Sequence, residues 1–577
     1  MGARRRSATR QSLVSPGSRS RRRFAFNIRF MNAQAFRWTS RTLCALAMIF
    51  AVAGCDGNAN PAPNIGGSLV ISAFADADVL LPPLTTTGQG LQVVDAIFDR
   101  LAQPVLQADG STKFLPALAT GWKWSSDSLS IDFALHSAAR WHDGQPVSAN
   151  DVRFTWNAYV DPALGAPSAG ALHNIDSVTV RDVHTATVWF KRRTPTQLSD
   201  VVSQMHILPA HLLATVPLAE WRTSEFARHP IGTGRFRFAN WQAGSRLEVV
   251  ADSNNYRGRP KLDRVVWTVA PDPSAATMRL FSGDADFLES VRPDAAAEFS
   301  KHPDVALLKS PSLAYGFLAF NTVASPAQKP AAIFADRALR RALTMTINRQ
   351  LVVQSVFDSA ARVALGPVTR IQLGRDTILP ALPFDTAQAV HLLDSLGWRA
   401  GKVGDVRQRN GQVLRFTTLV PSSSSQRIRV AVLLQQLFRT AGVQMDVEKV
   451  EFNTLNARLA KGDFDAAVLA IGADAELSGV RGVWSASASG AKGGVNFGRY
   501  ASARFDALID SAALQMRPDV ARRQYLNAYA EILGDAPAIW LFEPWNLSGV
   551  RSSVHPVGLR PDGWWMQLGD WTRDAKR

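Results

Sequence analysis

Alternation of apolar and polar residues over residues 131–135 predicts a half-buried strand, because successive strand side chains point to opposite faces. The run His142-Asp143-Gly144 then predicts a turn, since the Asp can bond its own backbone and the Gly tolerates positive φ. Ser148 and Asp151 have capping-box spacing, which predicts the start of a helix over residues 152–156. By itself this strand, turn and capped helix is an ordinary α/β corner.

Residues 413–474 carry alternating strand-type and helix-type patterns, which predict a βαβαβ unit. The expected strands are 414–420, 443–450 and 464–471, and the expected helices are 428–438 and 455–459. Helical connections imply parallel strands with right-handed crossovers. Ligands of such sheets collect beyond the carboxyl ends of the strands, and Asp474 follows the last strand at that position.

The rest of the chain reads as further strands and amphipathic helices punctuated by Gly and Pro. Strands are expected at 68–73, 177–190, 235–238, 246–250, 264–269 and 538–542. Helices are expected at 91–98, 336–347, 385–396, 503–516 and 520–533, with Asp385 and Asn348 as caps. We read the apolar stripes of these helices as core, and we predict an α/β fold.

The positive charge of the chain is concentrated in its first residues. The 577 residues have a formal charge of +16, but residues 1–54 hold eleven Arg and no Lys, Asp or Glu, which leaves +5 for the remainder. A mildly basic body of this kind does not favour nucleic acid as a partner. The apolar content of 46% allows a sizeable core.

The leader ends in a short apolar run over residues 43–54, a pattern typical of a secretory signal and too short for a stable membrane anchor. Its last residues, Val52-Ala53-Gly54-Cys55, resemble a bacterial lipobox. The resemblance implies cleavage before Cys55 and diacylation of its sulfur, and two acyl chains suffice for stable membrane attachment. An ordinary signal peptide that happens to contain a Cys is the alternative.

We therefore predict a signal peptide over 1–54, with Met31 as the preferred start, and a lipid-anchored tether over 55–64. Cys44 lies in the removed segment, so no internal disulfide is expected. Asp56 after the lipidated residue suggests retention at the inner membrane, on the periplasmic side of the envelope.

Motifs for catalysis or metal binding are missing from the sequence. G-x-S-x-G, G-x-x-x-x-G-K-[ST], G-x-G-x-x-G and H-E-x-x-H do not occur. His136 and His142 could share a metal, but solvated turn and strand histidines are the simpler interpretation, and His206 and His211 are spaced poorly for one helix face. We expect no enzyme activity, no metal and no cofactor.

Several short stretches occur in an order that carries more information than any one of them. They are residues 118–122 (LATGW), 131–156, 230–238 (PIGTGRFRF), 254–263 (NNYRGRPKLD), 319–322 (AFNT), 340–343 (RRAL) and 347–349 (INR). Together they resemble the extracellular solute-binding proteins of family 5, the oligopeptide- and dipeptide-binding proteins of ABC importers. The resemblance covers about residues 65–565.

The resemblance implies a periplasmic-binding-protein-like fold (type II, cluster C) with two lobes, a two-strand hinge and an extra N-proximal subdomain. The expected segments are 65–109, 230–315 and 541–577 for lobe I, 110–229 for the extra subdomain and 316–540 for lobe II. Hinge crossings are expected near residues 313–315 and 540–542.

In peptide-binding members a carboxylate placed like Asp474 pairs with the ligand α-ammonium. The ligand backbone adds as a strand to segments that match Asp99-Arg100-Leu101 and Ile471-Gly472-Ala473 here. The resemblance therefore implies the following ligand-binding residues, with Tyr315 added as an aromatic that can line the cleft: Asp474, Gly472, Ala473, Arg100 and Leu101. The alternative for Asp474 is a loop residue that caps the next helix or turn.

One departure leaves the ligand class open. Peptide binders commonly continue the Asp with an aromatic residue and a Pro, whereas Ala475-Glu476-Leu477 follow here. We predict a monomeric substrate-binding component that delivers peptides to ABC permease and ATPase subunits. The alternatives are the same fold with another solute (a metal chelate, a sugar or an opine) and a sensory or scaffolding lipoprotein without a transport role.

Overall fold

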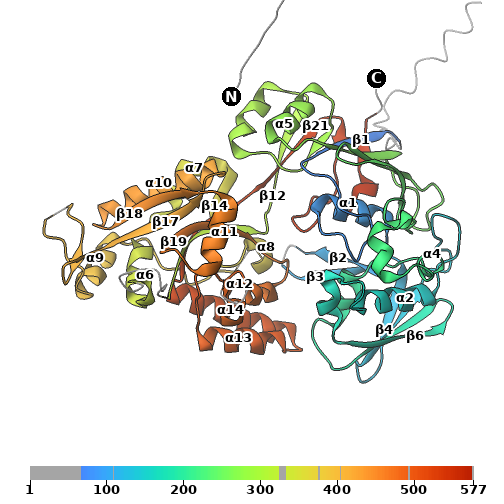
Figure 1. The fold of residues 1–577 in the computed structure, drawn as a ribbon, viewed down its shortest axis with the longest axis horizontal. Coiled ribbons are helices and arrows are strands. Elements are labelled where there is room, and N and C mark those ends of the chain that lie inside the picture. Colours follow the sequence, from blue (N-terminus) through green and yellow to red (C-terminus); the bar gives the residue numbers. More distant parts are fainter. Residues whose placement is uncertain are drawn as a thin grey trace, which may run out of the picture. The chain divides into compact units, whose positions relative to one another are not determined.

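The structure, a computed structural model, describes residues 66–107, 110–323, 333–374, 377–402, 404–490 and 494–574. Three main sheets organise this part of the chain (Figure 1). We call the seven-stranded sheet with its helices lobe I, the four-stranded sheet with its helices the subdomain, and the six-stranded sheet with its helices lobe II. The predicted signal peptide and Cys55 lie outside the described residues. Within them, none of the helices has the length and apolar content needed to span a membrane.

Lobe I has the strand order β12-β21-β11-β1-β10-β9-β8. Its strands are β1 (Ser68–Ala73), β8 (Phe236–Gln242), β9 (Arg246–Ala251), β10 (Arg264–Val269), β11 (Phe287–Leu288), β12 (Val305–Ser310) and β21 (Asn546–Arg551), and its helices are α1 (Gly88–Ile97) and α5 (Pro273–Ser282). The short pair β22 (Val554–His555) and β23 (Thr572–Arg573) follows. β10 runs antiparallel to β9 and parallel to β1, because β1 enters the sheet at its centre.

The subdomain has an antiparallel sheet of order β4-β5-β7-β6. Its elements are β4 (Ala119–Trp124), β5 (Ser130–Leu135), β6 (Ile175–Asp182), β7 (Thr185–Phe190), α2 (Ala149–Val160), α3 (Gln197–Gln204) and α4 (Ala210–Leu213), and the hairpin of β2 (Ala102–Leu106) and β3 (Thr112–Pro116) precedes them. The predicted capping box is confirmed, because the Ser148 amide donates to Asp151 Oδ2 at 2.8 Å. One continuous apolar core joins this sheet to lobe I.

Lobe II has the strand order β14-β20-β13-β19-β17-β18. Its strands are β13 (Ala314–Phe320), β14 (Ala361–Val363), β17 (Arg415–Pro421), β18 (Gln444–Val450), β19 (Ala466–Gly472) and β20 (Ala538–Pro544), with the small hairpin β15 (Gln408–Arg409) and β16 (Gln412–Val413). Its helices are α6 (Arg337–Met345), α7 (Arg349–Phe357), α8 (Arg370–Leu373), α9 (Thr386–Ser395), α10 (Ser425–Thr440), α11 (Phe452–Lys461), α12 (Val480–Trp484), α13 (Ala503–Ala513) and α14 (Pro518–Asp535). The predicted βαβαβ unit is β17, α10, β18, α11 and β19, and β17 pairs in parallel with both other strands.

Helices bury both faces of the lobe II sheet. Leu318 and Phe320 of β13 point into the core under α6, α7 and α10. Tyr315, Phe317 and Ala319 point into the opposite core, under α11 to α14. Because side chains alternate along a strand, the side chains from Tyr315 to Phe320 face one core or the other. This arrangement leaves the ends of the strands as the accessible part of the sheet.

The chain passes between the two large sheets twice. β12 of lobe I leads into β13 of lobe II through residues 311–313, and β20 returns to β21 through Trp545. The crossing expected at residues 540–542 is therefore wrong by a few residues, because β20 stays paired with β14 up to Pro544. Likewise, the predicted segment boundaries after Tyr315 and Trp540 fall inside β13 and β20. Asn546 Nδ2 donates to the carbonyl oxygen of Pro311 at 3.3 Å and ties the two crossings together.

The PIGTG stretch lies against the end of α1. A Cβ on Gly232 would lie 2.0 Å from the carbonyl oxygen of Ile97, so the backbone approaches α1 more closely than any side chain allows. His142 fastens this stretch: its Nδ1 accepts from the Gly232 amide at 3.2 Å, and its Nε2 lies 2.9 Å from the Gly234 carbonyl oxygen. Burial lowers the pKa of His142, which favours the neutral ring that this pair of bonds requires. His142 is thus a structural residue that joins two of the ordered sequence stretches.

Candidate functional site

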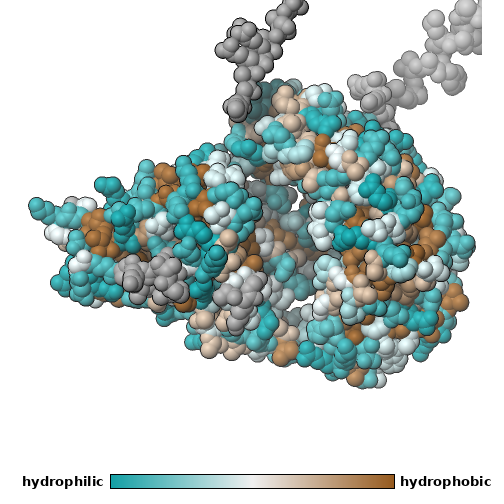
Figure 2. Space-filling model, in the orientation of Figure 1, coloured by the Kyte–Doolittle hydropathy of each residue, from teal (hydrophilic) through white to brown (hydrophobic). Residues whose placement is uncertain are grey.

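A cavity of about 1150 Å³ lies between the subdomain and lobe II. Figure 2 shows the surface hollowed between these two parts of the molecule. The subdomain side includes Phe114, Trp124 and residues 194–199, and the lobe II side includes Glu476, Ser478, Gln515, Arg522 and Tyr525. Most of the polar groups in the lining are hydroxyls and amides, with few formal charges. Such a lining suits a ligand that is held by many weak, adaptable contacts.

Part of the lobe II wall is the loop that follows β19, and side chains of α8 and α14 hold its backbone by hydrogen bonds. Gln372 Nε2 donates to the carbonyl oxygens of Asp474 at 2.7 Å and Glu476 at 3.2 Å. Tyr529 donates its hydroxyl to the carbonyl oxygen of Leu477 at 3.0 Å. Gln372 is itself fixed by the capping box at the start of α8, where its Oε1 accepts from the Thr369 amide at 2.7 Å. The loop therefore presents its side chains in a set direction.

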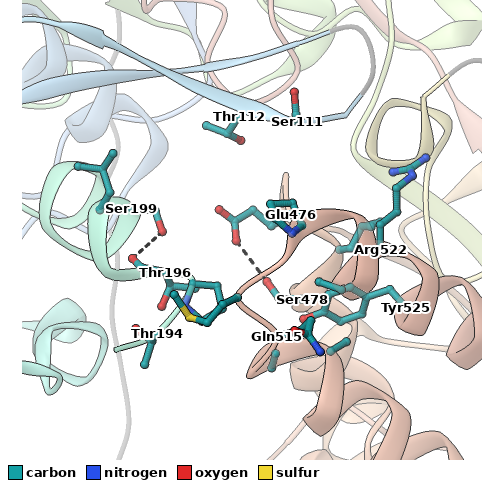
Figure 3. A pocket seen from close by; sticks show the side chains of 18 of the residues that line it. Ser111, Thr112, Thr194, Thr196, Ser199, Glu476, Ser478, Gln515, Arg522 and Tyr525 are labelled. Atoms are coloured by element: carbon teal, nitrogen blue, oxygen red, sulfur yellow. Dashed lines mark hydrogen bonds between the residues drawn. The ribbon is translucent and has the colours of Figure 1, made fainter. Parts of the chain in front are cut away.

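Glu476 points from this loop into the cavity (Figure 3). Ser478 donates its hydroxyl to the carboxylate at 3.3 Å, and among the described residues no cation pairs with it. The side chain is open to water, but the surrounding walls desolvate it in part. Burial, followed by the nearby Asp474 charge, raises the pKa of Glu476 above its usual value.

The subdomain wall is the first turn of α3 and the residues that lead into it. Ser199 donates its hydroxyl to the carbonyl oxygen of Thr196 at 2.9 Å (Figure 3). Thr196 donates its own hydroxyl to Asp200 at 2.9 Å. Burial raises the pKa of Asp200 to about 6, and the charge of Glu476 contributes to this rise. Glu476 lines the cavity, whereas Asp200 is bonded to the lining residue Thr196, and the two carboxylates repel each other.

The Asp200 carboxyl makes stability depend on pH. Its pKa is about 6 in the folded protein against 3.8 for the ordinary group, so folding favours the protonated form. The contribution of this carboxyl to the free energy of unfolding is fully present below about pH 3.8, where the group is protonated in both states. It is lost as the pH rises to about 6, because the unfolded chain ionises first. We expect Asp200→Asn to gain about 1–2 kcal/mol over wild type between pH 4 and pH 7, after allowance for solvent screening.

Thermal unfolding of both proteins at several pH values measures this gain. Asp176→Asn, which removes an exposed carboxylate from β6 of the same subdomain, is the control. A gain of equal size in both variants, or none in Asp200→Asn, would contradict the assignment.

Asp474 and Gly472 lie at an open edge of the lobe II sheet. β19 pairs with β13 as far as Gly472, whereas β17 pairs with β19 only at Ala466 and Ala467. The end of β19 on the β17 side thus has no ladder partner. Asp474 is exposed, and no hydrogen bond or ion pair to its carboxylate is found within the described part of the chain. Ala473 donates its amide to the Leu313 carbonyl oxygen at 2.5 Å, which holds the segment against the first crossing.

The other predicted residues lie away from the cavity. Arg100 pairs with Asp95 at 2.5 Å, and Leu101 is 1% exposed. The Leu118 and Ala119 amides donate to the carbonyl oxygens of Arg100 and Leu101, so those acceptors are already used. Tyr315 is 1% exposed, and its hydroxyl accepts from Trp484 Nε1 at 2.9 Å. The Tyr315 side chain is therefore a core group on the buried face of β13, and it does not line the cavity.

Sequence reasoning missed most of the lining. Glu476 carried a usable signal, since it stands two residues beyond Asp474 at the carboxyl end of a parallel strand. The residues of α3 and α14 carried none, because nothing local shows that these helices face one cavity. The histidines carried no metal signal, and the described residues contain no group of three or more His, Cys, Asp or Glu side chains that could hold a metal ion.

Known proteins with a similar sequence cover most of this chain. Residues 113–492 match the family model of the bacterial extracellular solute-binding proteins, family 5. The oligopeptide-binding protein AppA of Bacillus subtilis is 23% identical over 527 residues, which cover 87% of this chain and 92% of AppA.

Two solved structures share the fold. The structure of AppA in complex with a nonapeptide has a TM-score of 0.68 at 22% identity, covering 89% of this chain and all of that one. The substrate-binding protein CtaP of Listeria monocytogenes has a TM-score of 0.76 at 21% identity, covering 88% and 99% of the two chains.

Proposed function

The chain belongs to the bacterial extracellular solute-binding proteins of family 5, and from that premise we propose that it captures peptides between its lobes and delivers them to an ABC permease. Proteins of this family bind solutes for transport. The peptide assignment draws support from AppA, whose name and nonapeptide complex describe an oligopeptide binder. The permease and its ATPase subunits are the partners that this function requires.

The single observation that carries the peptide proposal is the open end of β19 with an exposed carboxylate directly beyond it. A peptide backbone that adds to this edge uses main-chain bonds, which are the same for every sequence. Its α-ammonium then meets Asp474 as a charge-assisted pair. Gly472 and Ala473 supply the backbone of the edge, and the adjacent cavity of about 1150 Å³ provides room for side chains of different size.

The two chain crossings near Pro311 and Trp545 are the proposed hinge. Both are short and bonded to each other through Asn546, so a change at one is passed to the other. Closure of lobe II on a ligand is then a rotation about this pair of segments. The subdomain shares its core with lobe I and moves with it.

Native mass spectrometry of the full chain, purified from a bacterial host in mild detergent, tests the peptide proposal. We expect a heterogeneous set of short peptides that chromatography and tandem mass spectrometry identify after release, because backbone recognition selects poorly among side chains. One non-peptide solute held in stoichiometric amount, such as a metal chelate, would overturn the proposal.

We also propose that Cys55 carries the lipid anchor on the periplasmic side of the envelope. The Val52-Ala53-Gly54-Cys55 sequence and the polar tether after it support this assignment. Cys55→Ser should move the protein from the membrane fraction to the soluble periplasmic fraction. The variant cannot carry acyl chains on this residue, and without them the protein has no stable attachment to the membrane. Intact mass measurement checks the chemistry, and an unmodified Cys55 in the membrane fraction would contradict it.

A further inference from the structure

The cavity between the subdomain and lobe II has apolar surface on both of its walls. Phe114, Trp124 and Leu198 line it from the subdomain side. All three are half-buried and pack against the apolar core that the subdomain shares with lobe I. Leu477 and Ala521 have the matching position on lobe II, where they pack against the core under α11 to α14. Each wall therefore presents one side of a packed apolar layer to the open space.

Met516 adds a flexible apolar side chain to the lobe II wall. It lies in the turn between α13 and α14, lines the cavity and is 44% exposed. Removing such surface from water is favourable, so a ligand group that covers Met516 binds better when it is itself apolar. The unbranched thioether adapts its shape to the group that it contacts. Met516 therefore suits aliphatic and aromatic groups of different shape.

Several hydroxyls of the lining are already used inside the protein. Thr196 donates its hydroxyl to Asp200 at 2.9 Å, and Ser199 donates to the carbonyl oxygen of Thr196 at 2.9 Å (Figure 3). Thr377 donates to the carbonyl oxygen of Leu373 at 2.8 Å. A donor that is paired in the protein adds little to the binding of a polar ligand group. These hydroxyls therefore do not offset the preference of the walls for apolar groups.

The charged side chains in the lining are Glu476 and Arg522, and their formal charges cancel. Arg522 donates to the carbonyl oxygen of Leu373 and to the hydroxyl of Thr377, the latter at 2.9 Å. In Figure 3 its guanidinium turns away from Glu476, which accepts from Ser478 at 3.3 Å. The lining thus has no net charge that would select a charged ligand group.

The cavity is within reach of a peptide whose α-ammonium lies at Asp474. The lining residues Glu476, Leu477 and Ser478 follow Asp474 directly in the loop after β19. A chain advances at most about 3.6 Å per residue, so this part of the wall lies within about 14 Å of Asp474. About four residues of an extended peptide span that distance. A side chain near the amino end of the peptide can therefore enter the cavity.

Resting on the function proposed above, we propose that the cavity between the subdomain and lobe II is a subsite for a large apolar side chain, aliphatic or aromatic, of the bound peptide. That side chain covers Met516 and lies between the apolar residues of the two walls. Because one wall belongs to the subdomain and the other to lobe II, closure removes both walls and the side chain from water together. The subsite takes a residue among positions two to five of the peptide and is separate from the place of the α-ammonium at Asp474.

The test is a capture experiment with a synthetic pool of peptides of about five to nine residues, with all side chains represented equally at every position. The full chain is incubated with the pool, and bound peptides are sequenced by mass spectrometry. We expect large apolar side chains to be enriched at least about fivefold over the input at one or two of positions two to five, a modest value for the burial of one side chain. In Met516→Asp, which places a charge on the wall, we expect this enrichment to fall below about twofold.

Leu514→Asp is the matched control. Leu514 lies in the same turn and is 65% exposed, but it is not among the residues that line the cavity. The change introduces the same charge close by and should leave the enrichment intact. Melting temperatures within about 2 °C of wild type show that both variants retain the fold. No apolar enrichment in wild type, unchanged enrichment in Met516→Asp, or equal loss in both variants would overturn the subsite.

If wild type retains no peptide at all, the proposed function fails, and the neutral fluorescent probe N-phenylnaphthylamine then decides the subsite separately. Saturable binding of this probe that Met516→Asp weakens at least about fivefold and Leu514→Asp leaves intact would support an apolar site. Absent binding in wild type, or equal binding by all three proteins, would overturn it.

Discussion

Asp474→Asn is expected to weaken peptide binding about 30-fold or more. A carboxylate that pairs with an ammonium in a closed, dry cleft contributes through a charge-assisted hydrogen bond, and removal of one partner of such a pair costs about 2–5 kcal/mol. Asparagine keeps the size of the side chain but loses the charge. Isothermal titration with a peptide identified from the native protein measures the loss.

N-terminal acetylation of the same peptide removes the other partner. Wild type should bind the acetylated peptide as weakly as Asp474→Asn binds the free one, and the two changes together should add little, since both delete one interaction. Asp510→Asn, an exposed carboxylate of lobe II paired with Arg481, is the control and should bind normally. Equal affinity of Asp474→Asn and wild type would exclude Asp474 from the site.

Gly232→Ala should destabilise the junction of lobe I with the subdomain by about 3 kcal/mol. The new Cβ would lie 2.0 Å from the Ile97 carbonyl oxygen and 2.7 Å from its carbon, and backbone atoms cannot rotate aside as a side chain can. The stretch around Gly232 would shift away from α1, and with it the bonds from His142 to Gly232 and Gly234. A melting temperature about 5 °C below wild type is the expected readout.

Gly121→Ala isolates the steric cause. Gly121 lies in β4, a Cβ added to it would meet no atom within 4 Å, and its φ is not positive, so alanine fits there without strain. Its melting temperature should stay within about 1 °C of wild type. If both variants melt alike, the close approach of Gly232 to α1 does not limit stability.

The sequence by itself determined the local structure and the family. The Ser148 and Asp151 capping box, the caps Asn348 and Asp385 and the βαβαβ unit of lobe II were all predicted correctly. These features are bonds or burial patterns between residues close in the chain, so the pattern of residue types contains them directly. The ordered stretches identified the family, which the family model confirms over residues 113–492.

The tertiary structure alone decided what surrounds the ligand. Tyr315 was expected to line the cleft. However, β13 is buried on both faces, and its register directs the Tyr315 ring into a core. Thr196 and Glu476 lie far apart in the chain and line one cavity because the subdomain and lobe II are placed against each other by contacts that no local pattern records. A cleft between lobes is a property of how separate surfaces face one another. The sequence therefore indicates the ends of the strands where ligands bind, whereas the packing of whole lobes decides which side chains lie there.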